Sequence, residues 1–290
     1  MTGVITKILA DIGPSVHIAP AGDFHIGPLV ITNSILYGWI CAALICFGMI
    51  WVARRVTVKP KGGVIQYVEL AVEFMANVVR DAFEDPKIGE RFVPFFVTLF
   101  VFILLNNWLG LLPLVGEGFY AGGHPLLRPF TGDLSGTLAM GVITMVLVYI
   151  SSVIYSGGLL NYFRHFFVGN PLNPLFFFIG ILEMLTDFTR VISLSLRLFL
   201  NITIGEIVIA VFAYLGHVIA PVTALPFTLL EILVGALQAY IFCILGVMYL
   251  AIAVNAAAEH REEDDQATES LTEHNVPETI GVTPGGSLSG

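Results

Sequence analysis

Formal charge is scarce in this chain of 290 residues. Only 12% of the residues are Asp, Glu, Lys or Arg, whereas about a quarter of an ordinary soluble domain is charged. Hydrophobic residues make up 56% of the sequence, and the mean hydropathy is +0.86. An ordinary soluble protein is therefore excluded, and the composition indicates a polytopic protein whose main surroundings are a lipid bilayer.

Motifs for metal, phosphate or covalent chemistry are also missing from the sequence. It has no CxxC or other zinc-ligand spacing, no glycine-rich phosphate loop, no plausible pair of nucleophile and base, and no internal repeat. Cys41, Cys46 and Cys243 lie in apolar segments and are interpreted as small core residues. We therefore expect no cofactor, no bound metal and no catalytic site within the chain alone.

Negative charge is concentrated at the C-terminal end. Residues 259–290 hold eight acidic residues against one basic residue, which accounts for −7 of the net charge of −9. An acidic, solvated tail argues nothing about nucleic acid, and no nucleic-acid partner is expected. The tail carries no recognisable motif and is predicted to be disordered.

Five apolar runs are long enough to cross a bilayer of about 30 Å. An amphipathic segment at 64–84, with polar residues at every third or fourth position, is predicted to lie at the membrane surface. The predicted fold is an all-α membrane domain over 29–258, with crossings at 29–53, 92–115, 134–156, 172–218 and 225–258. The last two runs exceed the length of an upright crossing, so we expect them to form a strongly tilted or broken hairpin.

Basic residues predict the orientation of these crossings. The first run ends in Arg54, Arg55, Lys59 and Lys61, and the positive-inside rule places that flank in the cytoplasm. The N-terminal segment 1–28 is then outside, and five crossings leave the acidic tail inside. Nine basic residues fall on the predicted inner side and two on the outer side, as this orientation requires.

Arg197 is the most unusual residue of the fourth apolar run. A guanidinium cannot lose its proton to escape a low dielectric, and its charge at mid-bilayer costs between about 2.5 and 17 kcal/mol. Ser193 and Asn201 share its helical stripe, whereas Glu206 lies half a turn around and about 13 Å along the axis. Since no acid shares its stripe, we expect the permanent charge of Arg197 to serve a function.

Acidic and polar residues lie on both sides of Arg197 along the chain. Those on the expected hairpin beyond Arg197 are Glu206, His217, Glu231 and Gln238. Those before it, spaced so that they can neutralise one another on one helical face, are Glu183, Asp187 and Arg190. The pattern resembles two half-paths for a cation, separated by a fixed positive charge.

Other interpretations of these residues remain open. Arg197 could bind Gln238, Asn201 or Glu231 and fix the hairpin, the acids could be structural carboxylates or an interfacial ion-pair cluster, and His217 could lie at headgroup level. A secondary transporter would also carry intramembrane charge, but its two similar halves with broken helices are not visible here. A purely structural assembly subunit would not need acids on both sides of one arginine.

Four short segments carry a resemblance to a known family. Residues 193–201 (SLSLRLFLN), followed by Gly205 and Glu206, resemble the essential-arginine motif of subunit a of the F-type ATP synthase. Residues 237–242 (LQAYIF) are similar to the signature of its last helix. Residues 89–95 (GERFVPF) and 107–113 (NWLGLLP) are similar to its second-crossing region. The resemblance covers about residues 30–258, with the motifs in the family's order.

The resemblance implies a role as the stator subunit of a proton-driven motor in the bacterial inner membrane. Arg197 would face a rotating ring of c subunits and couple proton transfer to its rotation. The b subunits of the peripheral stalk and the rest of the complex would be further partners. The implied proton path comprises Glu206, Glu231 and Gln238 towards the outside, Asn201 as the polar neighbour of Arg197, and Glu183 towards the inside. His217, Asp187 and Ser193 are further candidates.

Overall fold

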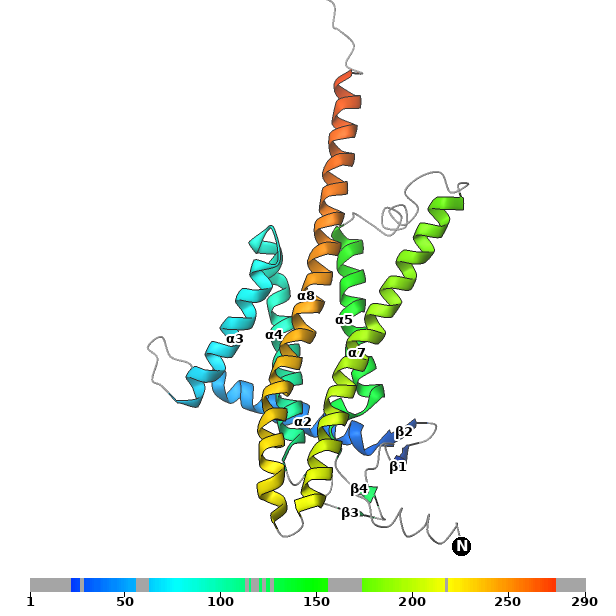
Figure 1. The fold of residues 1–290 in the computed structure, drawn as a ribbon. Helices are drawn as coiled ribbons and strands as arrows, with labels where there is room; N and C mark the ends of the chain where they lie inside the picture. Colours follow the sequence, from blue (N-terminus) through cyan, green and yellow to red (C-terminus); the bar gives the residue numbers. More distant parts are fainter. Residues whose placement is uncertain are drawn as a thin grey trace, which may run out of the picture.

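The computed structural model of the chain consists mainly of long helices (Figure 1). It describes residues 22–26, 29–55, 63–112, 115, 120–121, 124–125, 128–155, 174–216 and 219–274. The sequence predicted an external N-terminal segment (1–28) and an acidic tail (259–290). Residues 1–21, 27–28 and 275–290 of these two segments are outside the described part. The side chains of Glu183 and Asp187 also lie outside it, although their backbone belongs to a helix.

Five of the described helices are long and apolar enough to cross a membrane, which confirms the predicted all-α membrane domain. A sixth helix, α3 (Val64–Asp81), is the predicted amphipathic one, and its contacts are mainly with the helix that follows it. The five candidate crossings are α2 (Asn33–Ala53), α4 (Pro86–Gly110), α5 (Leu134–Tyr155), α7 (Pro174–Gly216) and α8 (Ala220–His274).

Short strands lie outside the helical domain. Strand β1 (Gly22–Ile26) pairs antiparallel with β2 (Leu29–Thr32), and β3 (Tyr120–Ala121) pairs with β4 (His124–Pro125). The run predicted to begin a crossing at Leu29 therefore enters its helix only at Asn33. The sequence LVIT of β2 is rich in β-branched residues, which favour an extended backbone.

Helix α4 begins before its apolar run and ends earlier than predicted. The crossing was expected at 92–115, but the helix spans Pro86–Gly110. Asp85 caps it by accepting a hydrogen bond from the Lys87 backbone N–H at 2.9 Å, and Pro86 stands at the first helical position, where its missing N–H costs nothing. Helix α4 thus begins with charged turns that precede its apolar residues.

Helix α8 starts earlier and ends later than the predicted crossing at 225–258. Pro221 lies in its first turn, where proline is tolerated, and Pro226 lies inside the helix. At the other end the helix continues to His274, so the prediction of disorder is wrong for residues 259–274. Helix-forming Ala, Glu, Gln and Arg residues dominate this stretch, and the next proline is Pro277.

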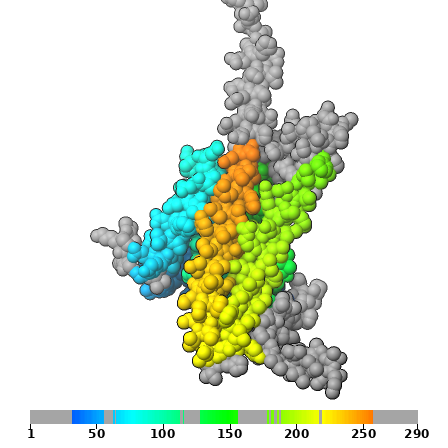
Figure 2. All heavy atoms as spheres, viewed as in Figure 1, coloured from blue at the N-terminus to red at the C-terminus, as the bar shows by residue number. Residues whose placement is uncertain are grey.

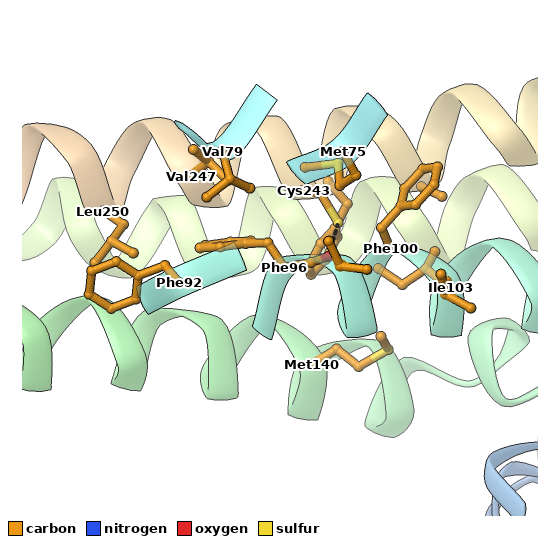
Figure 3. Packing of buried hydrophobic residues seen from close by; sticks show 14 of the residues in the cluster. Met75, Val79, Phe92, Phe96, Phe100, Ile103, Met140, Cys243, Val247 and Leu250 are labelled. Carbon is orange, nitrogen blue, oxygen red and sulfur yellow. Dashed lines mark hydrogen bonds between the residues drawn. The ribbon is translucent and has the colours of Figure 1, made fainter. Parts of the chain in front are cut away.

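Helix α8 lies at the centre of the described helices and contacts α3, α4, α5 and α7. Figure 3 shows buried side chains of α3, α4, α5 and α8 gathered in one cluster, among them Met75, Phe96 and Val247. Met75 and Val247 are completely buried, as is Phe96 between them. This cluster lies on one side of the α7/α8 pair and fixes its position relative to the other helices.

The α7/α8 pair forms an antiparallel hairpin with one uncovered side. In Figure 1 the two helices run side by side, with α4 and α5 behind them, and α2 runs across the others. Figure 2 shows the atoms of α7 and α8 on the face towards the viewer. Exposed apolar side chains of this hairpin include Leu200, Ile204, Leu229, Leu233 and Leu237. The predicted hairpin is present, with an apolar surface that no other described helix covers.

Candidate functional site

Arg197 lies on the exposed side of α7. Leu194, three residues before Arg197, and Leu198, the residue after it, are 2% and 0% exposed, so they hold α7 against the core. The Arg197 side chain points the other way and is exposed, as are Ser193 and Leu200. Helical spacing places these three residues on one stripe. The guanidinium therefore lies within an apolar surface instead of inside the bundle.

Arg197 forms no hydrogen bond or ion pair with any other residue of the described part. The alternative in which it locks the hairpin needs a bond to Gln238, Asn201 or Glu231, and none of these forms. Its distance of nine residues from Glu206 along α7 corresponds to about 13 Å. The charge is thus exposed on the hairpin and uncompensated by this chain's described residues.

Glu231 of α8 reaches α7 at Gly205. Glu231 is 6% exposed, and its carboxylate occupies the space that a side chain at position 205 would fill. Only glycine permits this approach, because any Cβ there would overlap both carboxylate oxygens. The contact brings Glu231 beside Glu206, the next residue of α7, and the two carboxylates interact electrostatically. The sequence analysis placed both acids on the hairpin beyond Arg197, and the packing of α7 against α8 brings them near each other.

Glu206 lies between α7 and the short 3-10 helix η1 (Phe130–Gly132). Its carboxylate oxygens are 3.6 and 3.8 Å from the point where a Cβ of Gly132 would be. Arg128 and Tyr37 also interact with it electrostatically. The outer candidate acid is therefore surrounded by groups from the start of α2, from the loop before α5 and from α8.

Several buried polar atoms between α7 and its neighbours have no hydrogen-bond partner among the described residues. Buried donors and acceptors are nearly always satisfied by protein or water, so these atoms are positions where water can bind. They are Ser195 Oγ, Asn201 Nδ2, Thr203 Oγ1, Glu231 Oε1 and Gln238 Nε2.

Gln238 lies deeper along the hairpin than the two acids. It is 5% exposed and follows Glu231 by seven residues, about 10.5 Å along α8. Because Glu231 meets α7 at Gly205 and the helices are antiparallel, Gln238 is level with about Leu198, next to Arg197. The polar atoms of this site thus extend from Glu206 to the depth of Arg197 and Asn201.

The opposite end of the hairpin holds Arg190. Its guanidinium carbon lies 4.7 Å from the centroid of the Tyr249 ring, a cation–π contact between α7 and α8. The predicted ion-pair partners Glu183 and Asp187 have side chains outside the described part, and His217 lies outside it altogether. Arg190 therefore connects α7 to α8 through its contact with Tyr249.

Helix α4 fixes α8 beside the site through two side-chain donors. Asn107 Nδ2 donates to the Gly235 carbonyl at 3.1 Å, and Trp108 Nε1 donates to the Ile232 carbonyl at 3.0 Å. Both carbonyls lie within four residues of Glu231. The residues that resemble the family's second crossing thus set the rotation of α8 and the direction of the Glu231 side chain.

Sequence reasoning missed Arg128 and Tyr37. Arg128 was counted as an outer basic residue, and Tyr37 was counted only as part of an apolar run, yet they are only 5% and 4% exposed. The sequence carries one weak signal: Arg128 is the single basic residue between Arg91 and Arg164. Among the described residues no group of His, Cys, Asp and Glu could hold a metal ion.

Comparison with known proteins gives a consistent result. The sequence profile of the ATP synthase A chain family matches residues 35–251. ATP synthase subunit a of Rhodospirillum rubrum is 34% identical over 257 residues, which cover 82% of this chain and 98% of that protein. The subunit a of Moorella thermoacetica is 32% identical over 236 residues, 81% of this chain and 96% of that protein.

The matched region contains every helix that builds the site. It begins two residues into α2 and ends within α8, past Tyr249. It therefore includes Arg197 on the uncovered face, the two carboxylates at Gly205, and the loop between α4 and α5. With a profile match over most of its length and relatives above 30% identity, this multi-pass membrane protein belongs to the family of subunit a of the F-type ATP synthase.

Proposed function

We propose that this chain is the stator subunit of a proton-translocating ATP synthase membrane motor, with Arg197 as the charge that couples proton transfer to rotation of a c ring. The observation that carries the proposal is the exposed guanidinium on an apolar face of the α7/α8 hairpin, which forms no ion pair with the part of the chain that the structure describes. In a bilayer such a charge needs a partner. A carboxylate on a neighbouring subunit supplies it without fixing it permanently.

Two proton half-paths would lead to this charge from opposite sides. The outer path uses Glu206, Glu231 and Gln238 and reaches the level of Arg197 and Asn201, which is supported by the row of unsatisfied polar atoms. The inner path would start on the other side of Arg197. It would use Glu183, with Asp187 and Ser193 as further participants. His217, on the outer side of Arg197, would be a further participant in the outer path.

Arg197 would separate these half-paths and act on the ring. A ring carboxylate beside the guanidinium is favoured in its ionised form, so it releases its proton before it passes and takes up another afterwards. A proton that leaked past Arg197 would dissipate about 2.3 kcal/mol for every 100 mV of membrane potential. A fixed positive charge opposes this leak.

The tilt of the hairpin fits contact with a ring. The apolar part of α7 spans Phe188–Gly216, 29 residues, or about 43 Å. Burying it in a hydrocarbon layer of about 30 Å requires an inclination of about 45°. Helix α2, 21 residues long, contacts α4 and runs in a different direction from the hairpin (Figure 1), and its length is enough to cross the same layer upright.

The same geometry supports the remaining assignments. We infer an external N-terminus and a cytoplasmic C-terminus from the basic flank after α2, and a bacterial inner membrane location from the bacterial relatives of the chain. The outer surfaces of α3 and α4 are available for b subunits of the peripheral stalk. Exposed Tyr67, Leu70 and Phe74 of α3 form an apolar surface there.

Replacement of Arg197 tests the proposal. In inverted membrane vesicles that contain the whole complex, R197A is expected to abolish ATP-driven proton pumping, while R54A, which removes an exposed charge at the end of α2, retains it. The amount of assembled complex is measured by immunoblotting in both variants. ATP-driven pumping by an assembled R197A complex would refute the motor role, and failure of R197A alone to assemble would favour a structural assembly subunit.

A further inference from the structure

The loop that contains η1 is enclosed by four helices. Arg128, Thr131 and Asp133 are 5%, 0% and 5% exposed, and the loop contacts α2, α4, α5 and α7. Connections between helices normally run over the surface and expose their polar groups. A buried arginine in such a loop carries a permanent charge, so its surroundings must compensate it.

Arg128 and Glu206 both approach Gly132. Arg128 Nη2 donates to the Gly132 carbonyl at 3.0 Å. The Glu206 carboxylate oxygens are 3.6 and 3.8 Å from the position of a Cβ on the same glycine. The guanidinium and the carboxylate also interact electrostatically. The loop therefore holds a positive charge against the acid at the end of the proposed outer path.

The other groups around these two residues do not replace this interaction. The Asp133 carboxylate accepts hydrogen bonds from the Ser34 hydroxyl and, at 3.1 Å, from the Ser135 backbone N–H. Tyr37 and Glu231 also face Glu206, but neither is a cation. Arg128 is the cation among the described groups that interact with Glu206.

We propose that Arg128 is a positioning residue of the outer proton path, which holds the Glu206 carboxylate beside Glu231 from the loop between α4 and α5. The proposal rests on the proposed role of Glu206. Two acids that meet at Gly205 repel each other when both are ionised. A fixed cation that approaches the same glycine of η1 as Glu206 offsets that repulsion and keeps the carboxylate directed at η1, so the pair can pass a proton without separating.

Four variants of the whole complex test this proposal: R128Q, R128K, E206Q and R128Q/E206Q. Pumping in inverted vesicles is measured per ATP hydrolysed, and the thermal dissociation midpoint of the purified complex is measured in parallel. We expect R128Q to lower pumping by about tenfold, because the interaction between two coupled charged residues is typically of that size. R128K keeps the positive charge, so we expect it to pump within about twofold of wild type. R54Q is the matched control, since Arg54 is exposed at the end of α2.

The double variant distinguishes an interaction from two independent effects. If Arg128 acts through Glu206, R128Q/E206Q pumps no worse than E206Q alone. Effects that multiply, or an R128K variant as impaired as R128Q, would overturn the proposal. If R128Q does not assemble, restored assembly of R128Q/E206Q supports an uncompensated charge as the cause, and continued failure of the double variant overturns the proposal.

The two readouts also separate this inference from the proposed function. If E206Q pumps like wild type, the outer role of Glu206 fails. The thermal midpoints still test the contact in that case: destabilisation by R128Q that disappears in the E206Q background demonstrates the interaction, and equal destabilisation in both backgrounds excludes it.

Discussion

A methyl group at Gly205 should disturb the meeting point of the two outer carboxylates. The Cβ of G205A would overlap the Glu231 carboxylate, which must retreat by roughly 1 Å to reach normal contact. Overpacking of this kind costs about 1 to 3 kcal/mol, and the better helix propensity of alanine returns about 0.5 to 1 kcal/mol. The net destabilisation is therefore modest, between about 0 and about 2.5 kcal/mol.

The effect of G205A on proton transfer should exceed its effect on stability. A misplacement of about 1 Å in a transfer path can cost up to about 100-fold in rate, and we expect ATP-driven pumping to fall at least about tenfold. In G205A/E231D the shorter acid withdraws from the new methyl group, so part of the activity should return. Gly48 of α2 has nothing within 4 Å of its Cβ position, which makes G48A the matched control.

The measurement is the initial rate of vesicle acidification, normalised to the amount of subunit a in the membrane. Unchanged pumping by G205A at normal abundance would refute the argument, because the overlap would then have been relieved without moving an acid that matters. Equal losses in G48A and G205A would also refute it, since the loss would come from substitution of any membrane glycine.

Two further predictions concern contacts away from the outer acids. Y249L removes the ring under Arg190 and should destabilise the complex by about 0.5 to 2 kcal/mol in thermal dissociation. Y249F keeps the aromatic face and should match wild type. Equal dissociation midpoints for the two variants would contradict the cation–π assignment. D85A removes the cap of α4 and should lower stability by about 1 kcal/mol while pumping per assembled complex stays unchanged; a selective loss of pumping would contradict a purely local capping role.

The apolar runs predicted the helices well because length and hydropathy alone limit what can cross a bilayer. Their ends were harder to predict, since caps and local propensity decide them. Asp85 and Pro86 begin α4 ahead of its apolar residues. Helix α8 continues past Ala258 because no proline or glycine lies between Ala258 and Pro277.

The candidate site was only partly predictable for a different reason. Helical spacing correctly separated Arg197 from Glu206, because both lie on α7. The contact of Glu231 with Gly205 depends on the register between α7 and α8, which spacing within either helix does not contain. Arg128 approaches Glu206 through a loop, where no periodic pattern exists. Contacts between elements were thus the part that required the structure.

Distance decides which carboxylate Arg197 can influence. At an effective dielectric constant of about 20, two unit charges interact with about 4 kcal/mol at 4 Å and about 1.3 kcal/mol at 13 Å. Glu206 lies at about the longer distance along α7, so its interaction with Arg197 is only about a third as strong. A carboxylate brought to the exposed guanidinium by a partner would gain about 3 kcal/mol more, over a hundredfold in its ionisation equilibrium. The exposed position of Arg197 therefore directs its charge outward, away from the acids of its own chain.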